Sequence, residues 1–163
     1  MKSIPEYQGI IVKGIEGFQK ENKDFSLYDP VNYILDIGGK RLRPVLTLLA
    51  TDLFGGIVSG SIKPALGIEV FHNFTLLHDD IMDNAPLRRG QATVHEKWNV
   101  NAAILSGDVM FVQAFSLVTS CENEFLRDVL DLFNVTAIEV CEGQQHDMDF
   151  ESRNDVSIDE YIE

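Results

Sequence analysis

The segment from Ile62 to Asp83 constrains the fold most, because its apolar residues recur every three or four positions. That spacing is typical of an α-helix with one buried face. The apolar positions are Ile62, Leu66, Val70, Phe74, Leu77 and Ile81. His72, Asp79 and Asp83 project within roughly 40° of one another, on the face opposite that stripe. We therefore expect a two-sided central helix, with core on one side and polar chemistry on the other.

The rest of the chain shows the same periodicity and no β signature. Sustained alternation is missing, and so are the Asn-Gly and Asp-Gly dipeptides that mark hairpin turns. Helix start and stop signals, such as Asp29-Pro30 and Gly38-Gly39, divide the chain into segments. The expected helices span about 5–20, 30–37, 45–54, 62–83 or 84, 101–120 and 124–151, with a short turn or helix at 93–98. The sequence predicts a single all-α domain over residues 1–163.

Composition excludes several classes of protein. The net charge of −13 argues against non-specific nucleic acid binding, which needs a basic face. Two cysteines, Cys121 and Cys141, make no disulfide framework and are expected to be reduced and largely buried. The N-terminal residues show no signal peptide, and no run of about eighteen apolar residues suits a membrane span. We therefore expect a cytoplasmic protein without membrane insertion.

Three carboxylates lie close together at the end of the central helix, at Asp79, Asp80 and Asp83. Asp79 and Asp83 are i and i+4 on one face, where like charges destabilise an isolated helix. A hard cation would compensate them, and oxygen ligands beside phosphorylated substrates suit Mg²⁺. Asp80 projects at the edge of the apolar stripe, so we expect it to support the other two or to fix the helix.

Basic residues form two short clusters in this acidic chain. Lys40, Arg41 and Arg43 follow two glycines and precede Pro44, which can open a helix. Exposed N–H groups, the helix dipole and three cations would all favour an anion there, although a solvated turn remains an alternative. Arg88 and Arg89 follow Pro86 in a predicted loop, within reach of the carboxylates.

These motifs, taken together, resemble a known family. The relevant segments are Gly38-Gly39-Lys40-Arg41-Leu42-Arg43-Pro44, the DDxxD from Asp79 to Asp83 with Arg88-Arg89-Gly90 after it, and Gly143-Gln144 before Asp147. Their order and separations resemble those of the trans-isoprenyl diphosphate synthases, also called polyprenyl synthetases. The resemblance covers essentially the whole chain.

The resemblance implies a helical bundle around a deep central cavity, usually in a homodimer. It implies that Mg²⁺ on Asp79 and Asp83 binds an allylic diphosphate together with Arg88. Isopentenyl diphosphate would be held by Lys40, Arg43, His72 and Arg89. Gln144 and Asp147 are i and i+3, and they are expected to line the substrate cavity. The reaction requires no side chain as a nucleophile.

Product length in this family depends on bulk just before the first aspartate, where this chain has Phe74 and Thr75. One aromatic ring there implies a short product, C15 to C20. Projection on a helical wheel puts Phe74 off the metal face by roughly 140°. A role in core packing alone is therefore an equal alternative for Phe74.

One departure from the family concerns the end of the chain. The family carries a second Asp-rich motif and a further lysine beyond the position of Glu163, so we expect the 163-residue chain to be inactive alone. A non-catalytic or regulatory synthase subunit and a terpene cyclase-like enzyme are alternatives. A cyclase binds no second diphosphate and does not need the Gly38–Pro44 cluster. A hydrolase is a distant alternative, with only His72 and His78 as candidate bases.

Overall fold

The computed structural model describes residues 2–22 and 24–162, which divide into two compact units with the boundary between Leu126 and Arg127. The first unit contains α1 (Ile4–Glu21), α2 (Tyr28–Asp36), α3 (Leu42–Leu53), the 3₁₀ turn η1 (Val58–Ser61), α4 (Ile62–Met82), β1 (Leu87–Arg88), β2 (Gln91–Ala92), α5 (Val94–Lys97) and α6 (Val100–Val118). The last helices are α7 (Leu126–Glu151) and α8 (Ile158–Ile162). The predicted helical fold is confirmed, with helix ends within about three residues of expectation.

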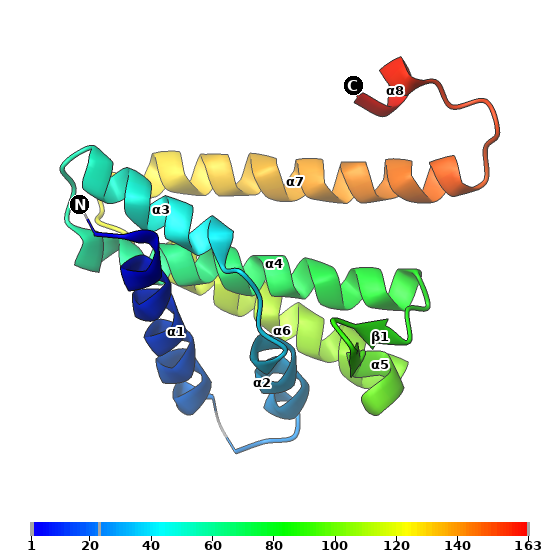
Figure 1. Cartoon of the computed structure of the whole chain (residues 1–163), viewed down its shortest axis with the longest axis horizontal. Helices are drawn as coiled ribbons and strands as arrows, with labels where there is room; N and C mark the ends of the chain where they lie inside the picture. Colours follow the sequence, from blue (N-terminus) through cyan, green and yellow to red (C-terminus); the bar gives the residue numbers. More distant parts are fainter. Residues whose placement is uncertain (1, 23, 163) are drawn as a thin grey trace. The chain divides into compact units, whose positions relative to one another are not determined.

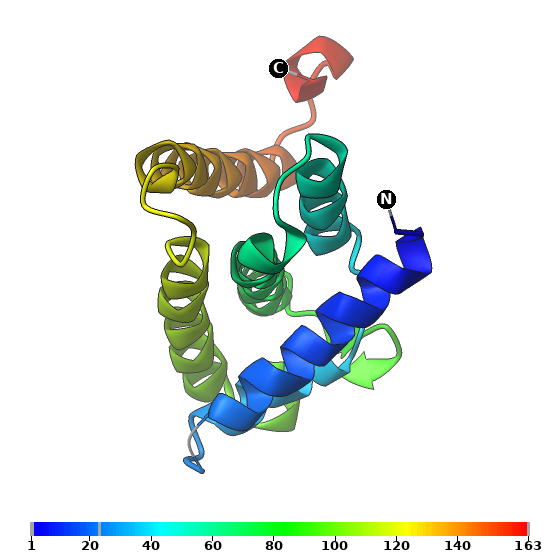
Figure 2. The same cartoon turned by 90° about the vertical axis from the view of Figure 1, so that its left-hand side faces the viewer.

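The first unit is built around α4, which contacts α1, α2, α3, α5 and α6. Figure 2 shows α4 (green) nearly end-on, between α6 (yellow-green) and α1 (blue). Neighbours on several sides make the buried surface of α4 wider than the predicted stripe. Glu69, Asn73 and Asp80 are buried along with Leu66 and Leu77. Polar side chains inside a core need partners, so these three are candidates for fixed roles.

The most extensive helix pairing joins α4 and α6, which run alongside each other in Figure 1. Two glycines allow this close approach. A Cβ on Gly67 would lie 2.6 Å from Val118 Cγ2 and 2.8 Å from the Val118 backbone nitrogen. A Cβ on Gly107 would collide with the His78 ring. A glycine in the middle of a helix lowers its helix propensity, so Gly107 predicts close packing, and the His78 ring confirms it.

We expect Gly67→Ala to lower the free energy of unfolding by about 1–3 kcal/mol, because the added methyl overpacks the α4–α6 contact. The matched control is Gly9→Ala in α1, where an added Cβ meets nothing within 4 Å. That change should raise the free energy of unfolding by about 0.5–1 kcal/mol, since alanine favours helix. Urea titration followed by Trp98 fluorescence measures both effects. Equal stabilities for the two variants would contradict the packing described.

A small hairpin follows α4 and is absent from the sequence prediction. The β1 and β2 strands pair antiparallel, and Arg89 and Gly90 form the turn with φ of 53° and 80°. Two successive positive φ angles are typical of a type I′ turn, whose twist matches that of the strands. The hydroxyl of Tyr33 on α2 donates to the Ala92 carbonyl at 2.8 Å and ties the hairpin to the bundle. The predicted loop is therefore only the Arg89-Gly90 turn, because Arg88 lies in β1.

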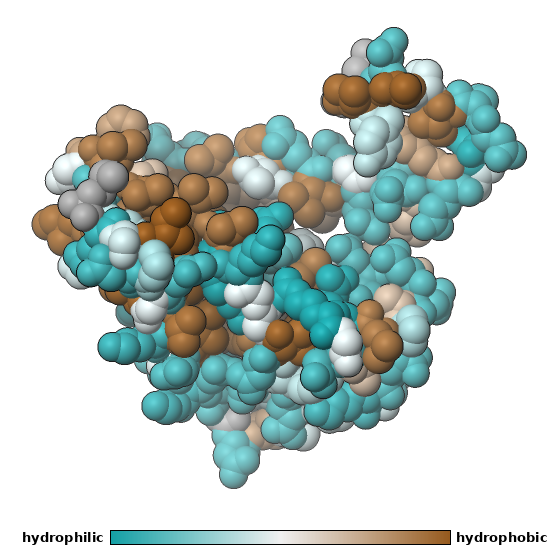
Figure 3. All heavy atoms as spheres, in the orientation of Figure 1, coloured by the Kyte–Doolittle hydropathy of each residue, from teal (hydrophilic) through white to brown (hydrophobic). Residues whose placement is uncertain are grey.

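The largely apolar sequence of residues 45–54 predicts a buried helix, but the structure buries only part of α3. Only one side packs, through Pro44, Val45 and Leu48, because α3 contacts α1, α4 and η1 along that side. Leu53 is 61% exposed, and Phe54 just after the helix is 87% exposed. Figure 3, in the orientation of Figure 1, shows brown apolar side chains gathered in the area where α3 lies. Hydropathy alone overestimated the burial of this helix.

The α6 helix has the length and composition of a possible membrane span, which corrects the sequence expectation that no segment does. The core helix of a soluble protein passes the same test. Ala103, Met110 and Ala114 of α6 are fully buried in the bundle, whereas Leu105 and Val112 are 58% and 64% exposed, so packing explains only part of the apolar character of this helix. Length and composition of one helix are weak evidence, so they do not place the chain in a membrane.

The second unit consists of α7, α8 and their connection. Arg153 holds the connection, because its guanidinium pairs with Asp155 at 2.9 Å and with Glu160 at 2.6 Å. Cys141 on α7 is exposed, and Cys121 in the first unit is half-buried. The prediction of two largely buried thiols is therefore wrong for Cys141.

Candidate functional site

A pocket of about 470 Å³ lies where the loop before α3 meets α4 and the hairpin turn. Its lining residues are Gly39, Lys40, Arg41, Leu42, Arg43, Glu69, His72 and Arg89. The structure thus brings together the four residues predicted to share one site, Lys40, Arg43, His72 and Arg89. We call this the cationic pocket. Four cationic side chains and one carboxylate, Glu69, line this hollow, and the excess of positive charge favours a multiply charged anion.

Backbone geometry explains the two glycines beside the pocket. Gly38 and Gly39 have φ of 81° and 154°, which side-chain-bearing residues rarely adopt. A Cβ on Gly39 would also lie 2.5 Å from Nη1 of Arg89. The missing side chain therefore lets the hairpin guanidinium approach the loop that carries Lys40.

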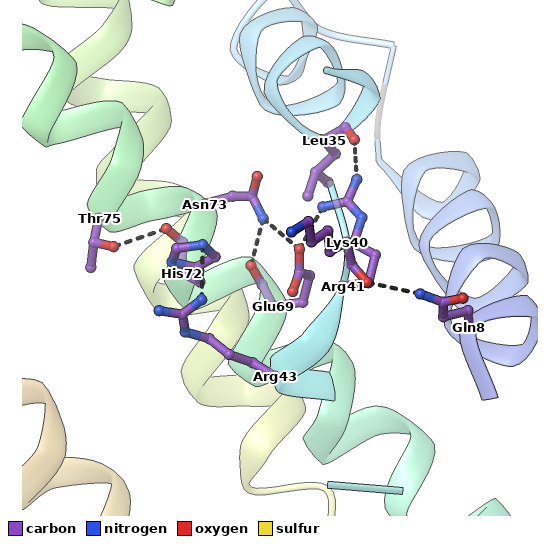
Figure 4. A network of polar contacts seen from close by, with 9 residues as sticks. All are labelled: Gln8, Leu35, Lys40, Arg41, Arg43, Glu69, His72, Asn73 and Thr75. Carbon is purple, nitrogen blue, oxygen red and sulfur yellow. Dashed lines mark hydrogen bonds and ion pairs between the residues drawn. The ribbon is translucent and has the colours of Figure 1, made fainter. Parts of the chain in front are cut away.

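Arg41 differs from its predicted role as a third cation for the anion. It is only 9% exposed, and its guanidinium donates to Glu69 Oε1 and to the Leu35 carbonyl, each at 2.5 Å. Asn73 donates to Glu69 Oε1 at 3.2 Å, and Figure 4 shows these groups converging between α2 and α4. The Arg41 charge is neutralised by Glu69, so Lys40, Arg43 and Arg89 supply the positive charge of the pocket.

His72 lies on α4 beside Arg43, whose Nη1 is 3.3 Å from His72 Nε2. An arginine can only donate, so this contact needs Nε2 unprotonated, as in the neutral ring. Burial lowers the pKa of His72 below its ordinary value of 6.5, and the nearby Arg43 guanidinium lowers it further. Glu69 acts in the opposite direction by raising that pKa. The imidazole is therefore neutral at pH 7. With Nε2 accepting from Arg43, the ring proton lies on Nδ1, which can donate a hydrogen bond.

The lowered pKa of His72 predicts a loss of stability in mild acid. The unfolded chain takes up a proton near pH 6.5 and the folded chain only at lower pH, so stability present above 6.5 falls as the pH drops through that value. His72→Gln should remove this part of the pH dependence. Urea titrations from pH 7.5 to 5.5 measure it, with His146→Gln on exposed α7 as the control. The same slope in His72→Gln and the unchanged chain would contradict the assignment.

Asp80 and Arg88 form a two-pronged ion pair. Nε of Arg88 donates to both carboxylate oxygens of Asp80, at 3.0 and 2.9 Å, and Nη2 lies 2.8 Å from Oδ1. Asp80 is only 2% exposed, in keeping with the expected helix-fixing role. The contact anchors the β1 strand to α4. The binding of an allylic diphosphate by Arg88 stays a prediction.

Asp79 and Asp83 lie at the C-terminal end of α4, where Asp79 is half-buried and Asp83 is exposed. Among residues 2–22 and 24–162, no group of three or more His, Cys, Asp or Glu side chains is arranged to hold a metal. Two hard carboxylates on one helix face fit Mg²⁺, which keeps several waters and takes further ligands from phosphate. They do not make a complete protein cage, so the donor set suits an ion bound together with its substrate.

Phe74 points towards α6 and belongs to an aromatic cluster. Its ring centroid lies 5.7 Å from Phe71, 4.8 Å from His78 and 5.3 Å from Phe111. Edge and tilted contacts at such distances stabilise a core. The Thr75 hydroxyl donates to the His72 carbonyl at 2.9 Å, within the helix. Both the core-packing and the chain-length interpretations of Phe74 are compatible with this placement.

Gln144 and Asp147 lie on α7, in the second unit. They line one hollow there, together with Phe150 and Arg153, as their i, i+3 spacing predicts. This hollow belongs to the second unit alone. Their role as substrate-lining residues stays a prediction.

Comparison with known proteins identifies the family. The family model described as polyprenyl synthetase matches residues 25–163, which include the cationic pocket and the DDxxD segment. The chain belongs to the polyprenyl synthetase family. The resemblance that the sequence motifs indicate is thereby confirmed.

Three proteins illustrate the similarity. The geranylgeranyl diphosphate synthase of Methanosarcina mazei is 45% identical over 139 residues, covering 84% of this chain and 43% of its own length. The geranylfarnesyl diphosphate synthase of Natronomonas pharaonis is 37% identical, covering 99% of this chain and 52% of its own. A crystal structure of a geranylgeranyl pyrophosphate synthase is 48% identical with a TM-score of 0.94, over 99% of this chain and 49% of that chain. This polyprenyl synthetase chain therefore spans about half the length of the curated relatives it matches.

Sequence reasoning missed the parts of the site that act through other residues. Glu69 and Asn73 are i and i+4 on α4, at buried positions inside an apolar stretch. Polar residues in such positions are a signal in principle, because they need partners. The partner of Glu69 is Arg41, 28 positions earlier, and only the folded chain identifies it.

Proposed function

We propose that the protein is a Mg²⁺-dependent prenyltransferase that condenses isopentenyl diphosphate with an allylic diphosphate to a short-chain prenyl diphosphate. Membership of the polyprenyl synthetase family and relatives named geranylgeranyl and geranylfarnesyl diphosphate synthases support this proposal. A cytoplasmic location and a homodimer accompany it as predictions. Light scattering after size-exclusion chromatography tests the dimer.

The observation that carries the proposal is the cationic pocket. Lys40, Arg43 and Arg89 surround a hollow, and no described carboxylate forms an ion pair with any of them within residues 2–22 and 24–162. A diphosphate would supply the missing negative charge, and guanidinium forks match phosphate oxygens. The same pocket argues against a terpene cyclase, because a cyclase binds no second diphosphate and would not need it. We assign this pocket to isopentenyl diphosphate.

The chemistry proposed for the second substrate uses the carboxylate end of α4. Asp79 and Asp83 would hold Mg²⁺, which neutralises charge on the leaving diphosphate oxygens as a Lewis acid. Cleavage of the allylic C–O bond leaves diphosphate and an allylic cation. The isopentenyl double bond then attacks that cation, and a proton is lost to the released diphosphate. The residues of this chain bind and orient the two diphosphates and exclude water, so none needs to act as a nucleophile.

The test incubates the protein encoded by the complete gene with isopentenyl diphosphate, Mg²⁺ and allylic starters of increasing length. Chromatography of the dephosphorylated products should show prenyl alcohols of C15 to C20. Release of prenyl alcohol without chain elongation would instead indicate a hydrolase. Cyclised hydrocarbons would indicate a cyclase, and either result would overturn the proposal.

Within this proposal, Phe74→Ala should lengthen the products by at least one isoprene unit. Removing the ring opens space between α4 and α6, where Phe74 contacts Phe71 and Phe111. Ser116→Ala, on an exposed position of α6, is the control. The same product assay measures the change. An unchanged length distribution from a folded Phe74→Ala enzyme would leave Phe74 a core residue only.

A further inference from the structure

A buried ion pair lies in the wall of the cationic pocket, between two lining residues whose charges neutralise each other. The side chains of Arg41 and Glu69 are only 8% and 4% exposed. Figure 4 shows the Arg41 guanidinium directed between Glu69 on α4 and the Leu35 carbonyl at the end of α2. Asn73 completes the Glu69 environment by donating to its carboxylate and its carbonyl. Three separate segments of the first unit therefore meet at this pair.

Stability alone does not account for such a pair. Burying two charges costs desolvation free energy, and apolar residues of the same volume often stabilise a protein as well or better. Arg41 also has a φ of 51°, an unfavourable value for a residue with a side chain. Its two hydrogen-bonding contacts hold that conformation in place. A costly pair that maintains a strained backbone indicates a geometric requirement at this position.

This geometric requirement concerns Lys40 and Arg43, which flank Arg41 in the sequence. Arg41 stands between Lys40 and Arg43 in the loop that enters α3, and both neighbours are exposed towards the pocket. Glu69 stands one helical turn before His72, the contact of Arg43. Clamping Arg41 to Glu69 therefore sets the position of Lys40 and of the first turn of α3, which carries Arg43, relative to the α4 side of the pocket.

We infer that Arg41 and Glu69 are positioning residues that hold Lys40 and Arg43 in the geometry that binds a diphosphate. The inference rests on the proposed diphosphate site. It makes a counterintuitive prediction for Glu69→Gln, which removes a negative charge next to an anion pocket. Electrostatics alone predicts tighter diphosphate binding by this variant, whereas lost positioning predicts weaker binding.

The test is calorimetric titration of the 163-residue chain with inorganic pyrophosphate. We expect Glu69→Gln to bind about tenfold more weakly, the effect of a lost charge-assisted hydrogen bond. Arg41→Lys should also weaken binding, because one ammonium cannot reach Glu69 and Leu35 on two sides as the guanidinium fork does. Arg41→Lys keeps both charges of the ion pair, so it tests the positioning role even if Glu69→Gln does not fold. Glu16→Gln, an exposed position on α1, is the matched control.

The outcomes separate this inference from the proposed function. Circular dichroism and Trp98 fluorescence first establish that each variant is folded. No pyrophosphate binding by the unchanged chain would overturn the diphosphate site and this inference with it. Binding by the unchanged chain, with equal or tighter binding by folded Glu69→Gln, would overturn the positioning role alone. Weaker binding by both folded variants, with Glu16→Gln unchanged, would support it.

Discussion

Replacing Lys40 and Arg43 together by glutamine should weaken pyrophosphate binding about 100-fold or more. Each side chain lines the cationic pocket, and each can donate a charge-assisted hydrogen bond to phosphate oxygens. Losing two such bonds multiplies their individual effects on the dissociation constant. Because phosphate contacts by exposed cations are screened by salt, the difference should shrink as ionic strength rises. Calorimetry at two salt concentrations measures both effects.

The matched control replaces Lys20 and Lys63 by glutamine. These exposed lysines lie on α1 and α4 outside the pocket, so the net charge changes equally while the pocket stays intact. The control should bind pyrophosphate within about twofold of the unchanged chain, since distant exposed charges are screened. Similar losses in the two double variants would show that binding follows net charge, and the pocket assignment would then be wrong.

Replacing Asp79 and Asp83 by asparagine should abolish the contribution of Mg²⁺ to diphosphate binding. In the unchanged chain we expect Mg²⁺ to strengthen binding of an allylic diphosphate at least about tenfold, because Asp79 and Asp83 would hold the ion and its charge would offset that of the diphosphate. An amide has no negative charge and is a much weaker partner for this hard cation. Titration with dimethylallyl diphosphate, with Mg²⁺ and with a chelator, measures the difference. Manganese paramagnetic resonance on the same variants reports metal binding directly.

Two further measurements make this metal prediction specific. The control is the double variant Asp24→Asn with Asp108→Asn, which replaces two exposed carboxylates of the first unit by amides. It should keep the effect of Mg²⁺ on diphosphate binding. Asp83→Asn alone should not lower the free energy of unfolding, because a negative charge at a helix C-terminus is unfavourable. A Mg²⁺ effect that persists in Asp79→Asn with Asp83→Asn would remove the metal assignment.

Much of the architecture followed from local pattern. Helix periods, Asp29-Pro30 and the paired glycines placed the long helices within about three residues, because caps and breakers act over a single turn. The hairpin was missed because its turn is Arg89-Gly90, and arginine is an unusual residue at a positive φ. The burial of α3 was overestimated because exposure depends on which neighbours cover a helix, and hydropathy does not specify neighbours.

The sequence by itself determined the family, the helical class and the residue types of the site, since short motifs specify chemistry and periodicity specifies helices. Tertiary structure alone decided which cations are available to an anion. Arg41 and Arg43 are two positions apart, yet Arg41 is neutralised by Glu69 and Arg43 lies beside His72 at the pocket. Asp80 likewise pairs with Arg88 while Asp79 and Asp83 lie on another side of α4. The partners that the fold supplies decide which of these charges are compensated, and adjacency in sequence does not specify those partners.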